Sequence, residues 1–154
     1  MAEAHELSVS HHIAAPPAVV WRAFTEHLTE WWCPRPWTSE IRALEWRPGG
    51  AFDIAMKGPD GEGGGGAGVV LEVTPERRFV FTSALAPGWQ PQEDFKMVGI
   101  FEFAPAADGG TDYRATARHW DEATKQTHEA MGFATGWGAV AVQLAEVAER
   151  LDAR

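Results

Sequence analysis

The fold is decided by the segment from His119 to Trp137, which reads HWDEATKQTHEAMGFATGW and leads into a long helical pattern. Glycine recurs at positions 132, 136 and 138. Each glycine inside a helix costs roughly 1 kcal/mol relative to alanine. Three glycines beside bulky apolar residues therefore suggest that something large, either a facing sheet or a ligand, approaches this helix closely.

The helix that follows has one apolar face, which can cover a sheet. At helical spacing, that face carries Phe133, Trp137, Val140, Leu144, Val147 and Leu151. Asp121 fits the N-cap position before the first turn. On a straight helix, with about 100° per residue, His128 lies opposite Trp137. His128 therefore points away from the sheet, or the helix kinks near the glycines, and the sequence leaves both open.

Size and charge narrow the class of protein. A chain of 154 residues fits one domain over residues 1–154. Its net charge of −9, without a basic stripe, argues against nucleic acid as a partner. The single cysteine, Cys33, excludes an intrachain disulfide and fits a reducing compartment. No signal peptide or membrane-spanning run is evident, so we expect a cytoplasmic protein without membrane insertion.

Alternation of apolar and polar residues indicates strands through most of the chain. A first strand ends at Ile13, and two short helices then carry the chain to Pro34. Period-two patterns dominate from 41 to 118, beginning with a strand over 41–46. The glycine run 63–66 is interpreted as part of a hairpin loop.

This order predicts an α+β fold in which a curved antiparallel sheet of about six or seven strands wraps one long C-terminal helix, with two short helices after the first strand. Small residues on the inward face, at Gly99, Ala115 and Ala117, favour a cavity between the helix and the sheet. A Gly99→Leu substitution should then block the cavity and leave the fold intact.

Several short motifs in this order resemble one superfamily. They are Ala15-Pro16-x3-Val20-Trp21, Trp31-Trp32, Pro48-Gly49-Gly50-x-Phe52, Asp60-Gly61 and Gly136-Trp137 before a leucine-bearing helix. Together they resemble the SRPBCC (START / birch-pollen-allergen-like) superfamily, and within it the family named for activators of the heat-shock chaperone ATPase, as single-domain bacterial members. The resemblance implies a helix-grip fold with a deep pocket. It implies no single activity, because known relatives include lipid carriers, polyketide cyclases, resistance proteins and chaperone co-factors.

An apolar pocket with few polar groups is the usual form of a small-molecule site. The residues expected around it are Trp32, Phe52, Met56, Phe81, Phe101, Tyr113, His119, Phe133 and Trp137. We expect Trp89 on a mobile rim and His128 at the mouth. Tyr113, the only tyrosine, could hydrogen-bond a ligand oxygen. All of these residues fit equally well into a plain hydrophobic core.

Histidine is the natural proton carrier near neutral pH. His119 is expected to point inward from a strand, either as a pocket acid/base or donor to a ligand carbonyl, or as a hydrogen-bonded histidine at the strand end. His128 fits a pocket-mouth polar group or a helix-surface residue. His11, on the apolar face of the first strand, is interpreted as a core residue.

The sequence contains no pattern typical of a metal or nucleophile site. His11 and His12 are adjacent on a strand and point to opposite faces. There is no His-x3-His, no cysteine pair and no Gly-x-Ser-x-Gly. The glycine run lacks the lysine of a phosphate loop. We therefore expect no metal and no cofactor. The acidic residues Asp53, Glu72 and Glu102 alternate out of phase with apolar neighbours and are expected to face solvent.

Three functions stay open. The first is a module that binds a hydrophobic or aromatic small molecule between helix and sheet. The second is an enzyme of the polyketide cyclase or hydrolase kind, with His119 and Tyr113 as proton carriers. The third is an interaction domain that modulates a chaperone ATPase, as the resemblance implies. A homodimer and a chaperone contact are possible partnerships, and exposed tryptophans would favour a dimer.

Overall fold

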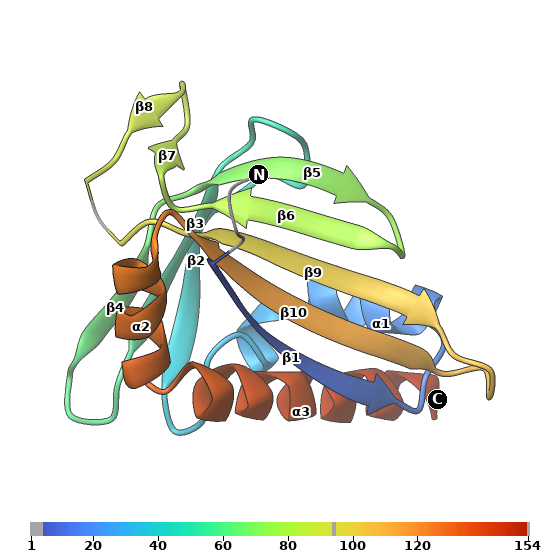
Figure 1. Ribbon diagram of the computed structural model, residues 1–154. Coiled ribbons are helices and arrows are strands. Elements are labelled where there is room, and N and C mark those ends of the chain that lie inside the picture. The colour runs from blue at the N-terminus through green and yellow to red at the C-terminus, as the bar shows by residue number, and fades with distance from the viewer. Residues whose placement is uncertain (1–4, 94, 154) are drawn as a thin grey trace.

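A five-stranded antiparallel sheet is the largest part of the computed structural model, which describes residues 5–93 and 95–153. Across it, the strands follow the order β1 (His5–Ile13), β10 (Thr111–His119), β9 (Val98–Pro105), β6 (Arg78–Thr82) and β5 (Val69–Thr74). β1 pairs with β10 from the far end of the chain (Figure 1). The antiparallel sheet expected from the alternation is confirmed.

Two smaller sheets complete the strands. One contains β2 (Thr38–Leu44), β3 (Phe52–Lys57) and β4 (Gly63–Gly66), and the other contains β7 (Leu85–Ala86) and β8 (Gln90–Pro91). About six or seven strands were expected in the sheet. The large sheet has five, and the short strands β4, β7 and β8 outside it lie in segments rich in glycine and proline. The interpretation of the glycine run as a loop was wrong. It pairs with β3, since strand pairing uses backbone groups that glycine supplies.

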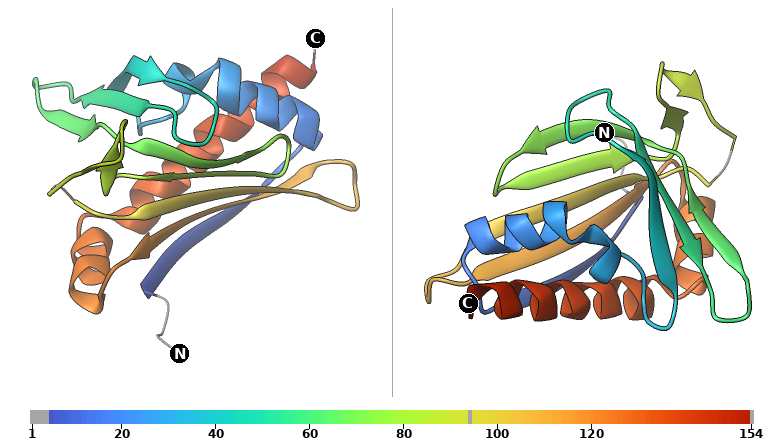
Figure 2. Two further views of the ribbon diagram at one scale, coloured as in Figure 1. Left: turned by 90° about the horizontal axis from the view of Figure 1, so that it is seen from above. Right: turned by 180° about the vertical axis from the view of Figure 1, so that it is seen from behind.

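The first and last helices lie against one face of the large sheet (Figure 2). α1 (Pro17–Glu26) and the 3-10 turn η1 (Leu28–Glu30) follow β1, as expected. The C-terminal helix α3 (Phe133–Asp152) packs against β1 and beside α1 (Figure 2). This is the arrangement of a helix-grip fold, in which the sheet wraps a long helix. Within the described part of the chain, no helix is both long and apolar enough to span a bilayer.

A break at Gly132 divides the helical pattern in two. α2 (Glu122–Ala130) ends there, and α3 begins at the next residue because Gly132 adopts a left-handed φ of 92°. Asp121 caps α2 as expected, accepting a hydrogen bond from the Thr124 N–H at 2.7 Å. Of the two alternatives for His128, the kink is correct. The turn directs its side chain inward, where it is 8% exposed.

The other two helix glycines do not mark a close approach. A Cβ built at Gly136 would meet only the Pro34 ring, at 3.9 Å, and one at Gly138 would meet nothing within 4 Å. The suggestion that something bulky lies against all three glycines was therefore wrong. Gly136 instead leaves space on the side of α3 that faces the sheet.

The core consists largely of aromatic rings gathered around Phe24 of α1. Its ring centroid lies 4.7 Å from that of Trp31, 5.3 Å from Phe101 and 5.1 Å from Phe103. Trp31 is fully buried, and its indole N–H donates to the Ala23 carbonyl at 3.1 Å. Each such ring buries a large apolar area, so this cluster fixes α1 against the sheet.

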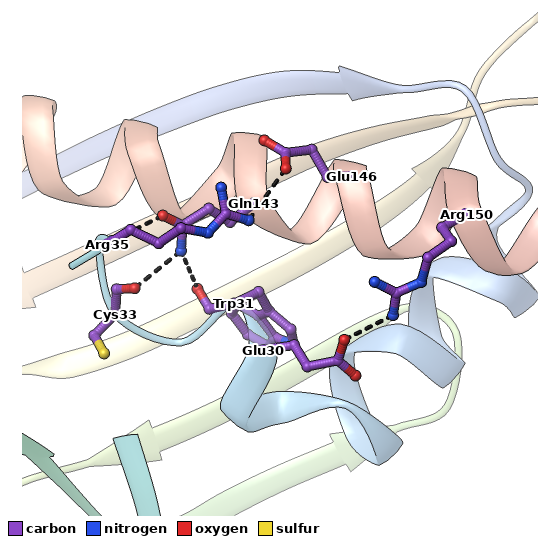
Figure 3. A network of polar contacts seen from close by, with 7 residues as sticks. All are labelled: Glu30, Trp31, Cys33, Arg35, Gln143, Glu146 and Arg150. Atoms are coloured by element: carbon purple, nitrogen blue, oxygen red, sulfur yellow. Dashed lines mark hydrogen bonds and ion pairs between the residues drawn. The ribbon is translucent and has the colours of Figure 1, made fainter. Parts of the chain in front are cut away.

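Gln143 fastens the segment after η1 to the long helix (Figure 3). Its amide nitrogen donates to the carbonyls of Trp31, at 3.2 Å, and Cys33, at 2.9 Å. Its amide oxygen accepts from the Arg35 backbone N–H at 3.0 Å. Gln143 is 6% exposed, and its bonds to the two carbonyls are buried, while the bond to the Arg35 N–H is part-buried. Arg35 also pairs with Glu146 at the surface, at 3.1 Å.

We expect Gly132→Ala to lower the free energy of unfolding by about 1 kcal/mol, because a Cβ disfavours the left-handed backbone. Gly138→Ala is the matched control. It should stabilise the protein by up to about 1 kcal/mol, since it adds helix propensity without a contact. Urea denaturation compares the two variants, and changes of the same sign would contradict the role assigned to Gly132.

Gln143→Leu should lower the free energy of unfolding by roughly 1–3 kcal/mol, because it leaves buried backbone groups without hydrogen bonds. Glu146→Gln is the control, because it removes only the exposed ion pair with Arg35 and should change stability by less than about 1 kcal/mol. Chemical denaturation measures both. Losses of equal size would show that Gln143 does not hold this segment.

Candidate functional site

A pocket of about 400 Å³ lies between α3 and the two larger sheets. Its wall is assembled from segments far apart in sequence: the chain after η1, strands β3, β4, β6, β9 and β10, and helices α2 and α3. Gln143 helps to position it, since the segment that Gln143 holds contributes Trp32 and Pro34. The two glycines of β4 on the wall, Gly65 and Gly66, bring backbone rather than side chains to it.

Most of the residues predicted around a pocket lie on this wall. They are Trp32, Phe52, Met56, Phe81, Phe101, Tyr113, His128 and Trp137. Alternation along the strands placed the side chains of β3, β6, β9 and β10 on the correct face. Their part in binding a ligand stays a prediction. Trp89, His119 and Phe133 do not line the pocket, each for a different reason.

Trp89 lies away from the pocket, and its expected place on the rim was wrong. It is 62% exposed on the hairpin between β7 and β8, where its ring packs over Gly49. A Cβ at Gly49 would approach that ring to 3.3 Å. No period marks the segment from Ala86 to Gln90, so the sequence carried no signal for where this ring points.

Phe133 lies behind the wall instead of on it. It is 4% exposed, and its ring centroid is 4.6 Å from that of Trp137 and 5.1 Å from that of His128. Phe133 therefore supports two wall residues from the rear.

His119 points inward as predicted, but it does not line the pocket, because His128 lies between it and the pocket. Its Nδ1 lies 2.9 Å from the carbonyl oxygen of His5, and its Nε2 lies 2.8 Å from Nδ1 of His128. It is 6% exposed. The strand-end alternative, a hydrogen-bonded histidine, describes it correctly. His128 is the member of the pair that reaches the pocket wall, so it is not a helix-surface residue.

Burial controls the protonation of the polar wall residues. Burial lowers the pKa of His128 to about 4, and repulsion from the positive charge that His119 carries when it is protonated adds to the lowering, so His128 is neutral at physiological pH. Burial also raises the pKa of Tyr113 well above its usual value, which keeps its phenol protonated. Tyr113 can therefore donate a hydrogen bond but is a poor base. Of the two expected proton carriers, His119 and Tyr113, burial therefore holds Tyr113 in its protonated form.

Sequence reasoning missed several wall residues. They are Pro34, Ile54, Ala67, Ser83, Phe95, Met97, Met131, Val140 and the glycines 65, 66 and 136. Ile54 and Met97 share strand faces with predicted residues, so alternation could have found them. Phe95 lies in a loop without any period and could not be found that way. Ala115 was predicted to leave space and does line the pocket.

Gly99 does not open the cavity as expected. A Cβ there would lie 2.5 Å from the ring of Phe81, so the aromatic ring already occupies that space. A leucine at position 99 would therefore have to displace the Phe81 ring, so we no longer expect Gly99→Leu to leave the packing undisturbed.

The structure also changes or adds to what was expected of three other residues, His11, Asp53 and Cys33. His11 is only half-buried, so it is not a core residue. Asp53 does not simply face solvent, because its Oδ1 is buried without a hydrogen-bond partner among the described residues. Cys33 is buried, and burial raises the pKa of its thiol. Over residues 5–93 and 95–153, no three His, Cys, Asp or Glu side chains gather in a way that could hold a metal.

The low pKa of His128 predicts a pH dependence of stability. Because the folded protein resists charging His128, the unfolded chain binds this proton first as pH falls below about 6.5. Stability should be lost between pH 6.5 and 4, by roughly 3 kcal/mol at most. Urea denaturation across this range should show a shallower loss for His128→Gln than for the wild type. Parallel curves would contradict a neutral, buried His128.

Comparisons with known proteins agree with this fold. The family model described as "Activator of Hsp90 ATPase homolog 1-like protein" matches residues 14–149. The crystal structure of a protein from Nitrosomonas europaea is 36% identical, covers 99% of this chain and 100% of its own, and gives a TM-score of 0.90. No curated protein matches the chain.

More distant structures share the fold alone. A protein from Mycobacterium smegmatis is 22% identical, with a TM-score of 0.78 over 95% of each chain. One from Arthrobacter aurescens is 19% identical, with a TM-score of 0.80 over 94% of this chain and 86% of its own. Because the family model spans most of the chain, this protein belongs to the Activator of Hsp90 ATPase homolog 1-like family of the SRPBCC superfamily.

Proposed function

We propose that this protein binds a hydrophobic or aromatic small molecule in the pocket between α3 and the sheets. The observation that carries the proposal is the pocket itself, about 400 Å³ in volume and walled mainly by aromatic and aliphatic side chains. Ligand sites in proteins are typically mostly apolar clefts of about 300–1,000 Å³ with a few placed polar groups. Membership of a superfamily that commonly binds hydrophobic ligands supports the same conclusion.

The arrangement of the aromatic wall also supports binding. Trp137 of α3 stacks on Phe101 of β9, with ring planes 7° apart and centroids at 5.8 Å. Trp32 meets Phe52 edge to face from the opposite segment, with centroids at 5.2 Å. Rings held by other rings present a rigid surface, so a bound molecule orders few side chains.

The two alternatives have weaker support. Catalysis by His119 and Tyr113 would require a histidine whose ring nitrogens already face His5 and His128, and a phenol that burial keeps protonated. Modulation of a chaperone ATPase is supported by the family description. We also propose that the protein is cytoplasmic and forms a single domain. The exposed Trp89 and Trp120 support the proposal of a homodimer.

The glycines of α3 supply a matched pair of variants that test the pocket. Gly136 lies on the wall and Gly138 does not, and a Cβ added at either position meets no atom closer than 3.9 Å. Leucine at either position raises helix propensity, so both variants should fold. We expect Gly136→Leu to fill the pocket and Gly138→Leu to leave it open.

The neutral dye N-phenyl-1-naphthylamine serves as the probe, since its fluorescence rises in apolar surroundings. We expect saturable binding by the wild type and by Gly138→Leu, and an affinity at least about tenfold weaker for Gly136→Leu. A tenfold loss corresponds to about 1.4 kcal/mol of binding free energy. No saturable binding by the wild type, or unchanged binding by Gly136→Leu, would refute the proposal.

A further inference from the structure

The pocket wall contains no charged side chain among the described residues. Its polar side chains, apart from the indole N–H groups of the tryptophans, are Ser83, Tyr113 and His128. The Ser83 hydroxyl donates to the Phe95 carbonyl at 2.6 Å and accepts from the Met97 N–H at 3.1 Å, so it is occupied within the protein. Tyr113 and His128 are then the side chains whose polar atoms can define what binds.

The hydrogen-bond chain behind His128 fixes which of its nitrogens carries the proton. A carbonyl oxygen can only accept, so Nδ1 of His119 must donate to the His5 carbonyl, 2.9 Å away. In its neutral form His119 has one N–H, which leaves its Nε2 as an acceptor. Nδ1 of His128, 2.8 Å away, must therefore donate to it. His128 is then left with an unprotonated Nε2.

That Nε2 belongs to a residue of the pocket wall. It has no hydrogen-bond partner among the described residues, and it is not among the fully buried side-chain atoms left without one. Three aromatic rings hold the His128 imidazole in place by edge contacts. Their centroids lie 5.0 Å (Phe95), 5.1 Å (Phe133) and 5.8 Å (Trp137) from the centroid of the imidazole. An acceptor is therefore presented in rigid, apolar surroundings, where an unpaired polar group is costly.

We propose, resting on the function proposed above, that the ligand is a neutral apolar molecule bearing a hydroxyl or N–H donor that bonds Nε2 of His128. An aromatic alcohol fits this description, because its ring packs on the aromatic wall while its hydroxyl donates to Nε2. The absence of charged side chains on the described wall disfavours a carboxylate, which would lose its hydration without gaining a counter-ion. An analogue without a donor leaves Nε2 unpaired.

Three biphenyls of similar shape separate these chemistries by displacement of the naphthylamine dye at pH 7.5, above the ordinary imidazole pKa of about 6.5. They are 4-phenylphenol, with a donor, 4-methylbiphenyl, without one, and biphenyl-4-carboxylate, an anion. We expect the wild type to bind the phenol about tenfold more tightly than the methyl compound, and the carboxylate most weakly.

His128→Phe keeps a ring in place and removes the acceptor. We expect this variant to lose the preference for the phenol while its affinity for 4-methylbiphenyl changes by less than about threefold. His11→Phe, a histidine change outside this pocket, is the control and should keep the wild-type preference. Far-ultraviolet circular dichroism establishes that both variants are folded.

The possible outcomes distinguish a failure of the role of His128 from a failure of the proposed ligand binding in the pocket. If the dye binds and both neutral biphenyls displace it equally, or if His128→Phe retains the preference, the pocket stands and the role of His128 is overturned. If neither the dye nor any biphenyl binds, both proposals fall. Tightest binding of the carboxylate would overturn the choice of a neutral ligand.

A second measurement needs no variant. Long-range ¹H–¹⁵N correlation spectra of the free protein at pH 7.5 report which imidazole nitrogens carry a proton. We expect the Nδ1–H tautomer for His128 and for His119. A proton on Nε2 of His128 would overturn the proposal, because the pocket would then present a donor in place of an acceptor.

Discussion

The left-handed backbone at Gly132 is the constraint on which the polar end of the pocket depends. On one continuous helix, His128 and Trp137 would lie on opposite sides. The break brings their rings within 5.8 Å and lets α2 carry His128 to His119 on β10. Glycine tolerates this backbone because it has no Cβ. One residue thus converts an amphipathic helix into two elements that close a pocket.

The rest of the pocket depends on the contacts that fix the elements forming its wall. Gln143 ties the segment bearing Trp32 to α3 through three backbone groups (Figure 3). The aromatic cluster around Phe24 fixes α1. On the opposite side, the glycine strand β4 contributes backbone without side chains. The space survives because bulky residues are anchored on one side and side chains are missing on the other.

Much of the fold could be predicted from sequence because periodicity reports burial directly. Alternation placed Phe52, Phe81 and Phe101 on the pocket face. It failed where the backbone departs from a period. Glycine fits both a helix interior and a left-handed break, so Gly132 could not be told apart from Gly138. Contacts between loops and distant elements, such as Trp89 on Gly49, leave no periodic signal. The hydrogen bond between His119 and His128 depended on the same unpredictable break.

Xenon tests most directly whether the space between α3 and the sheets is open and apolar. The protein would first be refolded from denaturant to remove any carried molecule, then crystallised and pressurised with xenon, which enters dry apolar cavities. The account predicts a xenon site among Trp32, Phe81 and Trp137. A crystal without xenon there, with Trp137 collapsed onto Phe81, would contradict it.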